Sequence, residues 1–381
     1  MKKLAFATCH CDGVLNTNET SPGNYLLLSV KPNWHDATDI TGFRSSVQNK
    51  YYVTDFMRFL LKAKMYEDLK VPFFVCLDEM NLAPVEEYFA DFLSVIESRK
   101  RRKDGKIVTD PIVPASVFTE KYAADYNIFM DMGLKPVAEE LKPDDIEANE
   151  QDGHTDNFER QDIVDELKSV GLTIPQNVVI IGTVNMDDTT NTFSRKVIDR
   201  AMTFETIVQK FGESYFDSDI ALHYVENPRK GELFISDEVR ATEMLTDGRY
   251  SLTDGEEKKI LDFVNHVNED LEGTPFKISY RILNETILLY RAKREIANIM
   301  EKEGDFEKDV TFNTDLNTIF DDILMQKVLP RIEGDYEKCN KCLENLLNRC
   351  NAEGWTQSMK KIDFMKNRFG GDHTGFTSFW N

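Results

Sequence analysis

Two acidic residues follow directly after a short apolar run in the first quarter of the chain. The run 73–77 (FFVCL) is typical of a buried strand, and Asp78 and Glu79 come immediately after it. In an α/β sheet, ligands bind beyond the carboxyl ends of the strands. There, one carboxylate can hold Mg²⁺ and the next can polarise an attacking water. An acidic turn after a strand is also a common surface feature, so this pair alone leaves both a hydrolase site and a solvated turn open.

A polar amide follows another apolar run about a hundred residues later. The run 178–181 (VVII) continues into Gly182, Thr183, Val184 and Asn185. An amide at the end of a neighbouring strand can orient a water beside a terminal phosphate. Asn is also frequent in strand-end turns, but its occurrence after the acidic pair, in this order, favours the functional interpretation.

Two arginines lie on a helix-like stretch, 192–201, beyond this amide. Arg195 and Arg200 could each reach a neighbouring subunit and neutralise charge that develops on a phosphate. Asp199 could hold the arginine in place. A solvated charged helix face is the alternative, and it would be preferred if the other two motifs were absent.

Four segments together resemble the McrB-type AAA+ NTPases. The resemblance spans roughly residues 20–290 and is weaker beyond. Segment 78–86 resembles the Walker B motif of that group, 182–190 resembles sensor 1, and the other two match its second-strand and post-sensor segments. The four segments are 30–43 (VKPNWHDATDITGF), 78–86 (DEMNLAPVE), 182–190 (GTVNMDDTT) and 193–201 (FSRKVIDRA).

This resemblance implies a ring-forming nucleoside triphosphatase that drives a separate nuclease. The implied partners are further copies of the chain in a ring, expected to be a hexamer, and a McrC-like nuclease subunit that acts on foreign or modified DNA. DNA is contacted mainly through the complex. The implied cofactors are Mg²⁺ and ATP or GTP.

The same resemblance assigns roles to individual residues. Asp78 would bind Mg²⁺, Glu79 would activate water, and Asn185 would be sensor 1. Arg200 would be the arginine finger that reaches a neighbouring subunit. Two further residues would contact the nucleotide: Asp188, which matches an Asp of the McrB sensor 1 signature, and Arg281, which would act as a sensor 2 residue on a lid helix.

The sequence departs from the family in two ways. The McrB signature Asn-Thr-Ala-Asp-Arg-Ser, linked to guanine preference, is NMDDTT at 185–190, so the choice between ATP and GTP stays open. In addition, no GxxxxGK[ST] loop, whose amides and lysine cradle phosphates, occurs in the sequence. Residues 2–8 resemble the helix that follows that loop. We therefore expect a truncated gene, a miscalled start or a split subunit.

The elements that position these residues alternate between strands and helices. Apolar runs at 25–30, 73–77 and 178–182, with a fourth candidate at 202–208, predict strands, and 54–64 and 85–98 predict helices. This pattern predicts an α/β fold with a parallel sheet covered on both faces, which in this family is a three-layer AAA+ core without its first strand and phosphate loop.

Two domains are expected. Residues 1–209 would form the core, with an acidic insertion at about 138–165, and residues 210–381 a helical lid with a helical extension. Helical periodicity in this second part covers 255–271, 280–301, 316–328 and 336–350.

Composition and charge narrow the class of protein. The 381 residues carry a net charge of −21, which disfavours direct binding to nucleic acid except through a local basic surface such as 99–106. No apolar run is long enough for a membrane span. Six cysteines in a chain of this length favour free thiols and a cytoplasmic location over a disulfide framework or a zinc site.

Two rival hypotheses remain beside the motor. The chain could be a non-catalytic assembly module that presents Arg200 to an intact neighbour, or a truncated fragment unable to bind nucleotide alone. Measurable nucleotide affinity favours the motor, and its absence favours the module.

Overall fold

The computed structural model describes most of the chain. The described residues are 1–10, 12–137, 158–185, 191–206, 222–229, 231–303, 314–370 and 375–380. They divide into two compact units, which we treat separately. The first unit comprises Met1–Phe193 and Gly212–Asp237, and the second comprises Ser194–Phe211 and Glu238–Asn381.

The first unit is a mixed α/β structure. Its helices are α1 (Lys2–Thr8), α2 (Thr38–Thr41), α3 (Asp55–Met65), α4 (Val85–Tyr88), α5 (Ala90–Glu97), α6 (Ala115–Thr119), α7 (Ile128–Asp131) and α8 (Gln161–Ser169), with 3₁₀ turns η1 (Met80–Leu82) and η3 (Gly231–Leu233). Its strands are β1 (Tyr25–Ser29), β2 (Phe43–Ser45), β3 (Lys50–Tyr52), β4 (Phe73–Asp78), β5 (Lys100–Arg101), β6 (Ile107–Val108), β7 (Pro111–Pro114), β8 (Gly171–Thr173) and β9 (Val178–Gly182).

The central sheet has three parallel strands in the order β1-β4-β9. These are the first three of the runs that the sequence predicts as strands. The register sets Asp78 opposite Ser29 of β1, and Leu77 opposite Gly182 of β9. The carboxyl ends of the three strands therefore meet at one edge of the sheet. β4, in the middle, is buried from Phe73 to Leu77.

Both faces of this sheet are covered. Neighbouring residues of β4 point to opposite faces, and each meets a different part of the unit. Phe73 packs against Phe59 of α3, with ring centroids 5.2 Å apart. Phe74 packs against Phe234, which belongs to the segment after residue 222, at 5.7 Å. The same segment covers α1, where Tyr224 lies 4.9 Å from Phe6. The prediction of a parallel sheet covered on both faces is thus confirmed.

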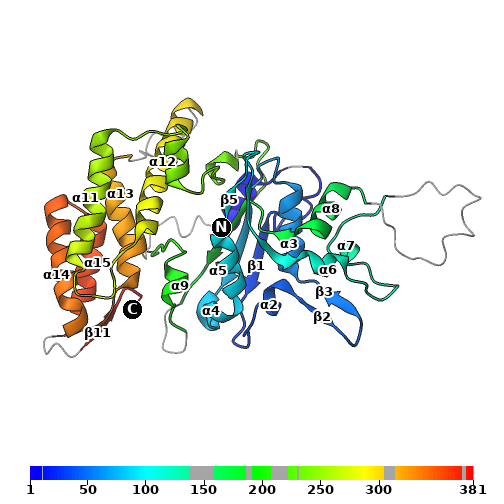
Figure 1. Cartoon of the computed structure of the whole chain (residues 1–381), viewed down its shortest axis with the longest axis horizontal. Coiled ribbons are helices and arrows are strands. Elements are labelled where there is room, and N and C mark those ends of the chain that lie inside the picture. The colour runs from blue at the N-terminus through cyan, green and yellow to red at the C-terminus, as the bar shows by residue number, and fades with distance from the viewer. Residues whose placement is uncertain are drawn as a thin grey trace, which may run out of the picture. The chain divides into compact units, whose positions relative to one another are not determined.

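The second unit is mostly helical. Its long helices run alongside one another, and the chain end returns to them as β11 (Figure 1). Its elements are α9 (Arg195–Ile198), α10 (Ala241–Thr246), α11 (Asp254–Asp270), α12 (Tyr280–Glu303), α13 (Leu316–Ile323), a π-helical turn η4 (Leu324–Val328), a 3₁₀ turn η5 (Leu329–Arg331), β10 (Glu333–Asp335), α14 (Tyr336–Glu353), α15 (Thr356–Asn367) and β11 (Phe376–Ser378).

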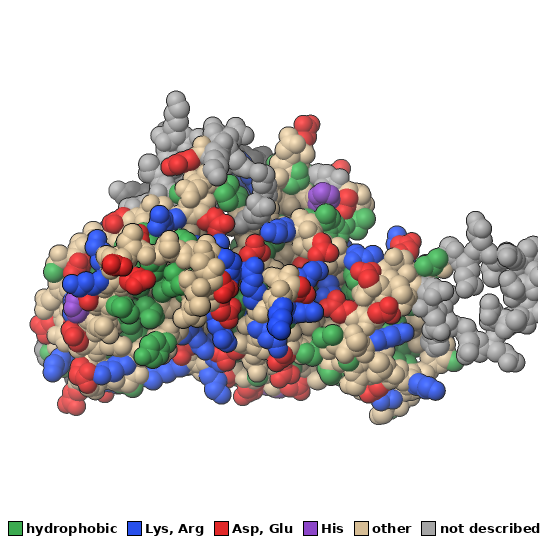
Figure 2. Space-filling model, turned by 45° about the horizontal axis from the view of Figure 1, so that its top comes forward, with side chains coloured by type: hydrophobic (Ala, Val, Ile, Leu, Met, Phe, Trp, Pro, Cys, Tyr) green, Lys and Arg blue, Asp and Glu red, His purple; other side chains and the backbone are tan. Residues whose placement is uncertain are grey.

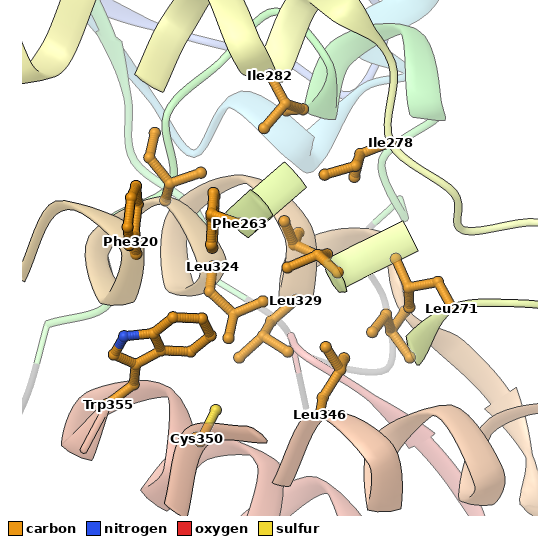
Figure 3. Packing of buried hydrophobic residues seen from close by; sticks show 14 of the residues in the cluster. Phe263, Leu271, Ile278, Ile282, Phe320, Leu324, Leu329, Leu346, Cys350 and Trp355 are labelled. Carbon is orange, nitrogen blue, oxygen red and sulfur yellow. The ribbon is translucent and has the colours of Figure 1, made fainter. Parts of the chain in front are cut away.

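An aromatic cluster lies at the centre of this unit. Phe263 of α11 stacks on Phe320 of α13, with centroids 4.4 Å apart and planes at 7° (Figure 3). Trp355 meets both rings edge-on, and its indole N–H donates to Asn317 at 2.7 Å. These contacts join three helices that are far apart in the sequence.

The end of the chain packs on the same unit. β11 pairs antiparallel with β10. Thr377 is fully buried, and its hydroxyl donates to the Met365 carbonyl at 2.6 Å. The Trp380 indole donates to the Pro330 carbonyl at 3.2 Å. Phe379 is buried as well, whereas Phe376 is exposed, so Thr377, Phe379 and Trp380 anchor the end of the chain.

Several predicted boundaries need correction. Helix 85–98 is interrupted at Phe89, so α4 and α5 are separate. The predicted strand 202–208 is not a strand over 202–206, and its last two residues lie outside the described residues. The segment 138–165, predicted as an acidic insertion, includes the start of α8 at Gln161, which buries Ile163 and Val164. Residues 138–157 lie outside the described residues.

The division into units also differs from a single boundary after residue 209. Segment 194–211 groups with the helical unit and segment 212–237 with the sheet unit. Contacts explain both assignments: Thr203 N–H donates to the Gln326 carbonyl in the helical unit, and Arg229 N–H donates to the Ala7 carbonyl in the sheet unit.

Candidate functional site

Three of the predicted site residues meet at the carboxyl edge of the sheet. Asp78 ends β4, Glu79 follows it, and Asn185 lies three residues after β9. The side-chain amide of Asn185 donates to Glu79 Oε1 at 3.0 Å. Residues more than a hundred positions apart are thus in direct contact, because β4 and β9 are parallel neighbours.

Thr183 links the two strand ends. Its hydroxyl donates to Asp78 Oδ1 at 2.8 Å and accepts the Glu79 N–H at 2.9 Å. Its carbonyl accepts the Met80 N–H at 2.9 Å. One side chain thereby fixes both the carboxylate of Asp78 and the backbone of Glu79. Thr183 is not among the residues predicted for the site, although it stands in the segment that leads to Asn185.

Glu79 has an unusual backbone conformation. Its φ of 53° and ψ of 49° lie in the left-handed region, where a side chain other than glycine costs roughly 1–2 kcal/mol. This conformation turns the chain from β4 into η1. The Glu79 side chain is exposed and makes the contact with Asn185.

Asn81 is a buried residue that the sequence analysis did not single out. It is fully buried, and its amide donates to the Asn185 carbonyl at 2.9 Å and the Asn191 carbonyl at 3.4 Å. In return, the backbone N–H and the amide of Asn191 both donate to the Asn81 carbonyl, at 2.9 and 3.1 Å. These bonds fasten both described ends of the loop that follows β9.

Gly182 permits the close approach of η1 to β9. A Cβ atom at Gly182 would lie 1.9 Å from the sulfur of Met80. The η1 turn is also held by α4, because the hydroxyl of the buried Tyr88 donates to the Met80 carbonyl at 2.9 Å. Hence the turn that bears Glu79 and Asn81 is fixed on several sides.

The donor set at this edge fits Mg²⁺. Mg²⁺ binds through one or two carboxylates and keeps waters or takes phosphate oxygens as its other ligands. Asp78 is partly exposed and supplies one carboxylate. Among the described residues no group of three or more His, Cys, Asp or Glu could hold a metal by itself. A single carboxylate such as Asp78 can hold Mg²⁺ only when the ion keeps waters or takes other oxygen ligands.

The predicted arginines lie in the second unit. Arg200 follows α9, and one of its guanidinium nitrogens donates to the Lys196 carbonyl at 2.7 Å. Arg281 is exposed in the first turn of α12. The structure does not place these two residues relative to Asp78, because the two units are described separately. Asp188 lies outside the described residues.

The basic turn 99–106 is largely balanced by acids in the first unit. Lys100 lies 3.5 Å from Asp110, and Lys106 lies 3.2 Å from Asp68. Basic and acidic side chains are likewise interspersed on the face drawn in Figure 2. Burial lowers the pKa of Arg99, and the negative charge of Glu67 raises it by a smaller amount. Two lysines of this turn are thus paired with acids that lie outside it, at Asp68 and Asp110.

The cysteines that the structure describes are buried and form no disulfide. They are Cys9, Cys76, Cys339, Cys342 and Cys350. Burial raises the pKa of Cys342 to about 11 and that of Cys350 to about 12. These thiols are therefore protonated and unreactive near neutral pH.

Comparison with known proteins identifies one family model. A domain of unknown function (DUF8727) matches residues 236–375, which lie almost entirely in the helical unit. The match covers less than half of the chain. No curated protein matches the sequence. No helix among the described residues is long and apolar enough to cross a membrane.

Proposed function

We propose that this chain is a nucleoside-triphosphate-hydrolysing subunit of a McrB-like AAA+ complex. The observation that carries the proposal is the contact between Glu79 and the Asn185 amide beside Asp78, at the joined ends of two parallel strands. An acid that holds Mg²⁺, an acid that activates water and an amide that orients it are the parts that phosphate transfer to water needs.

The strand order gives further support. AAA+ sheets have the order 5-1-4-3-2, and β1-β4-β9 fits the 2-3-4 part of that order. The family would add a strand beside β9. No described strand pairs with that side of β9.

In the proposed mechanism Asp78 would hold Mg²⁺, and Glu79 would take a proton from the attacking water. Asn185 orients this water and the Glu79 carboxylate, to which it already donates. Thr183 keeps the Asp78 carboxylate in place. Mg²⁺, when bound, would neutralise charge on the phosphates. Arg200 would act on the nucleotide of a neighbouring subunit in a ring, and the complex would drive a McrC-like nuclease on DNA in the cytoplasm.

A non-catalytic assembly module is the second candidate, because the sequence has no GxxxxGK[ST] loop. Such a module would sit in mixed rings and present Arg200 to an intact subunit.

Nucleotide binding separates the two candidates. The full chain is titrated with fluorescent ATP and GTP analogues, with and without Mg²⁺, and Asp78→Asn is titrated in parallel. The motor predicts binding that Mg²⁺ strengthens and that Asp78→Asn weakens at least about tenfold, or about 1.4 kcal/mol. The absence of binding under all conditions would refute the motor and support the module. The two analogues also show whether ATP or GTP is preferred.

A further inference from the structure

The segment that carries Arg200 is fastened to the helical unit by side chains distant in sequence. It consists of α9 and the residues that follow, up to Glu205. α9 is a single turn, and a helix this short is not stable alone. Its conformation must therefore come from contacts with the rest of the unit.

Among these contacts, those of Lys327 require the largest desolvation of a charged group. Its side chain is only 1% exposed, and an ammonium group in that environment must be fully paired. Its Nζ donates to the carbonyls of Asp199 and Ala201 at 3.1 and 2.8 Å, and forms an ion pair with Glu285 at 2.8 Å. The three acceptors use all three of its protons. Lys327 thus caps the carbonyl end of α9 and spans to α12.

The backbone around Lys327 is itself irregular. After α13 the chain continues through the π-helical turn η4 and the 3₁₀ turn η5. π-helical turns are rare and occur frequently at functional sites. η4 bears Lys327, and η5 ends at Arg331, whose guanidinium lies 3.3 Å from Asp199. This irregular stretch directs two cations at the end of α9.

Two more contacts hold the segment downstream of Arg200. The Thr203 N–H donates to the Gln326 carbonyl at 3.2 Å. Lys361 of α15, which is 7% exposed, forms an ion pair with Glu205 at 2.7 Å. Its Nζ also lies 4.4 Å from the ring centroid of Phe379. Contacts to η4 thus lie on both sides of Arg200, and the contact to α15 lies after it.

We infer that Lys327 and Lys361 are positioning residues that hold the Arg200 segment on the helical unit. A well-packed apolar pair would generally stabilise such a contact as well as a buried ion pair. The two lysines instead bind particular carbonyl and carboxylate oxygens, which fixes the segment in one register. Arg200 is consequently presented by the helical unit. Its role as a finger depends on the proposed function, whereas the fastening does not.

Hydrogen exchange of the full chain, measured by mass spectrometry, tests the fastening. Lys327→Met and Lys361→Met are compared with Lys360→Met, which changes an exposed neighbour of Lys361. We expect exchange at the amides of Arg200, Ala201 and Thr203 to become at least about tenfold faster in the first two variants, with α11 and α14 unchanged. The control should match the wild type.

Two results would overturn the inference: unchanged exchange in the segment, or an equal increase throughout the helical unit. Lys327→Met leaves Glu285, whose side chain is 22% exposed, without its ion pair and could prevent folding. In that event Lys361→Met decides alone, and the double variant Lys327→Met/Glu285→Gln provides a second measurement.

Hydrolysis measurements separate the fastening from the proposed function. If Arg200 is the finger, Arg200→Ala lowers kcat, and Lys361→Met lowers kcat in the same direction with little change in KM. Lys361→Arg, which keeps the charge, should restore it. If Arg200→Ala hydrolyses nucleotide like the wild type, the finger role is wrong, and the exchange data still decide the fastening. If Arg200→Ala lowers kcat but Lys361→Met does not, the positioning role is wrong.

Discussion

At the scale of single residues, Thr183 holds the Asp78 carboxylate, and Asn81 holds the backbone at Asn185. Asp78, Glu79 and Asn185 could be placed together because the carboxyl ends of parallel strands share one edge. Thr183 and Asn81 could not be recognised in the same way. Their importance lies in contacts across more than a hundred residues, and neither position has a sequence pattern of its own.

We expect Asn81→Ala to destabilise the first unit. It removes the donor to the Asn185 and Asn191 carbonyls in a fully buried position, which costs roughly 1–3 kcal/mol. The free energy of unfolding is measured in urea from the fluorescence of Trp34. Both parent and variant carry Phe in place of Trp355 and Trp380. Trp34 packs edge-on against Tyr88 of this unit at 5.3 Å.

The control for this variant is Thr192→Ala, an exposed residue beside Asn191. Its unfolding free energy should stay within about 0.5 kcal/mol of the parent. An equal loss in both variants would show that Asn81 has no special role.

We expect Glu79→Gly to stabilise the first unit although it removes the proposed catalytic acid. Glycine adopts the left-handed conformation of residue 79 without a Cβ clash, and the gain is about 0.5–1 kcal/mol after the greater flexibility of unfolded glycine is counted. Glu79→Gln keeps the strain and should leave the free energy of unfolding nearly unchanged. The same fluorescence measurement compares them, and a less stable glycine variant would contradict this account of the turn.

At the scale of elements, local sequence accounts for most strands and long helices but not for their interruptions. β1, β4 and β9 follow the apolar β-branched and aromatic runs, and α3 begins after the Thr54 cap as its polar–apolar period indicates. Helix 85–98 breaks at Phe89, where φ is −111° and ψ is 10°, and hydrophobic periodicity does not predict this break. Residues 202–206 contain β-forming types, yet their hydrogen bonds go to the helical unit.

The start of α11 allows a prediction that depends on pH. Thr253 and Glu256 form a capping box, in which Glu256 accepts the Thr253 N–H at 2.8 Å, and the Tyr290 hydroxyl donates to it at 2.5 Å. The Thr253 N–H lowers the pKa of Glu256, and the Tyr290 hydroxyl adds to this effect. A lowered pKa in the folded state means that the stabilisation is present above the ordinary Glu pKa of about 4.3. It is lost as the pH falls through the folded value.

We therefore expect Glu256→Gln to destabilise the helical unit by about 1 kcal/mol at pH 7. The difference from the wild type should shrink as the pH falls below about 4.3, because only the wild type loses a charge-dependent contribution. Thermal unfolding midpoints at a series of pH values measure this. A difference that stays constant with pH would mean that the Glu256 charge does not contribute.

At the scale of the whole molecule, the prediction of a sheet part followed by a helical part describes the general order of the chain, but no single boundary describes the units. Segment 194–211 belongs with the helices, because Lys327, Gln326 and Lys361 bind it. Segment 212–237 belongs with the sheet through contacts such as Phe234 on Phe74. A single boundary, placed where strand propensity fades, cannot assign segment 194–211 to the helices and the later segment 212–237 to the sheet. The family match to residues 236–375 begins close to the point, after Asp237, where the chain enters the helical unit for the second time.

The central claim is that the acids after β4 act on a bound nucleotide, and steady-state hydrolysis by the full chain tests it most directly. Wild type, Glu79→Gln and the control Glu86→Gln, an exposed glutamate on α4, are compared at saturating Mg²⁺-ATP and Mg²⁺-GTP. The account predicts that Glu79→Gln lowers kcat by at least about a hundredfold, as expected for loss of a general base, while its nucleotide affinity and the Glu86→Gln control stay close to the wild type. Equal hydrolysis by wild type and Glu79→Gln, or none by the wild type, would contradict it.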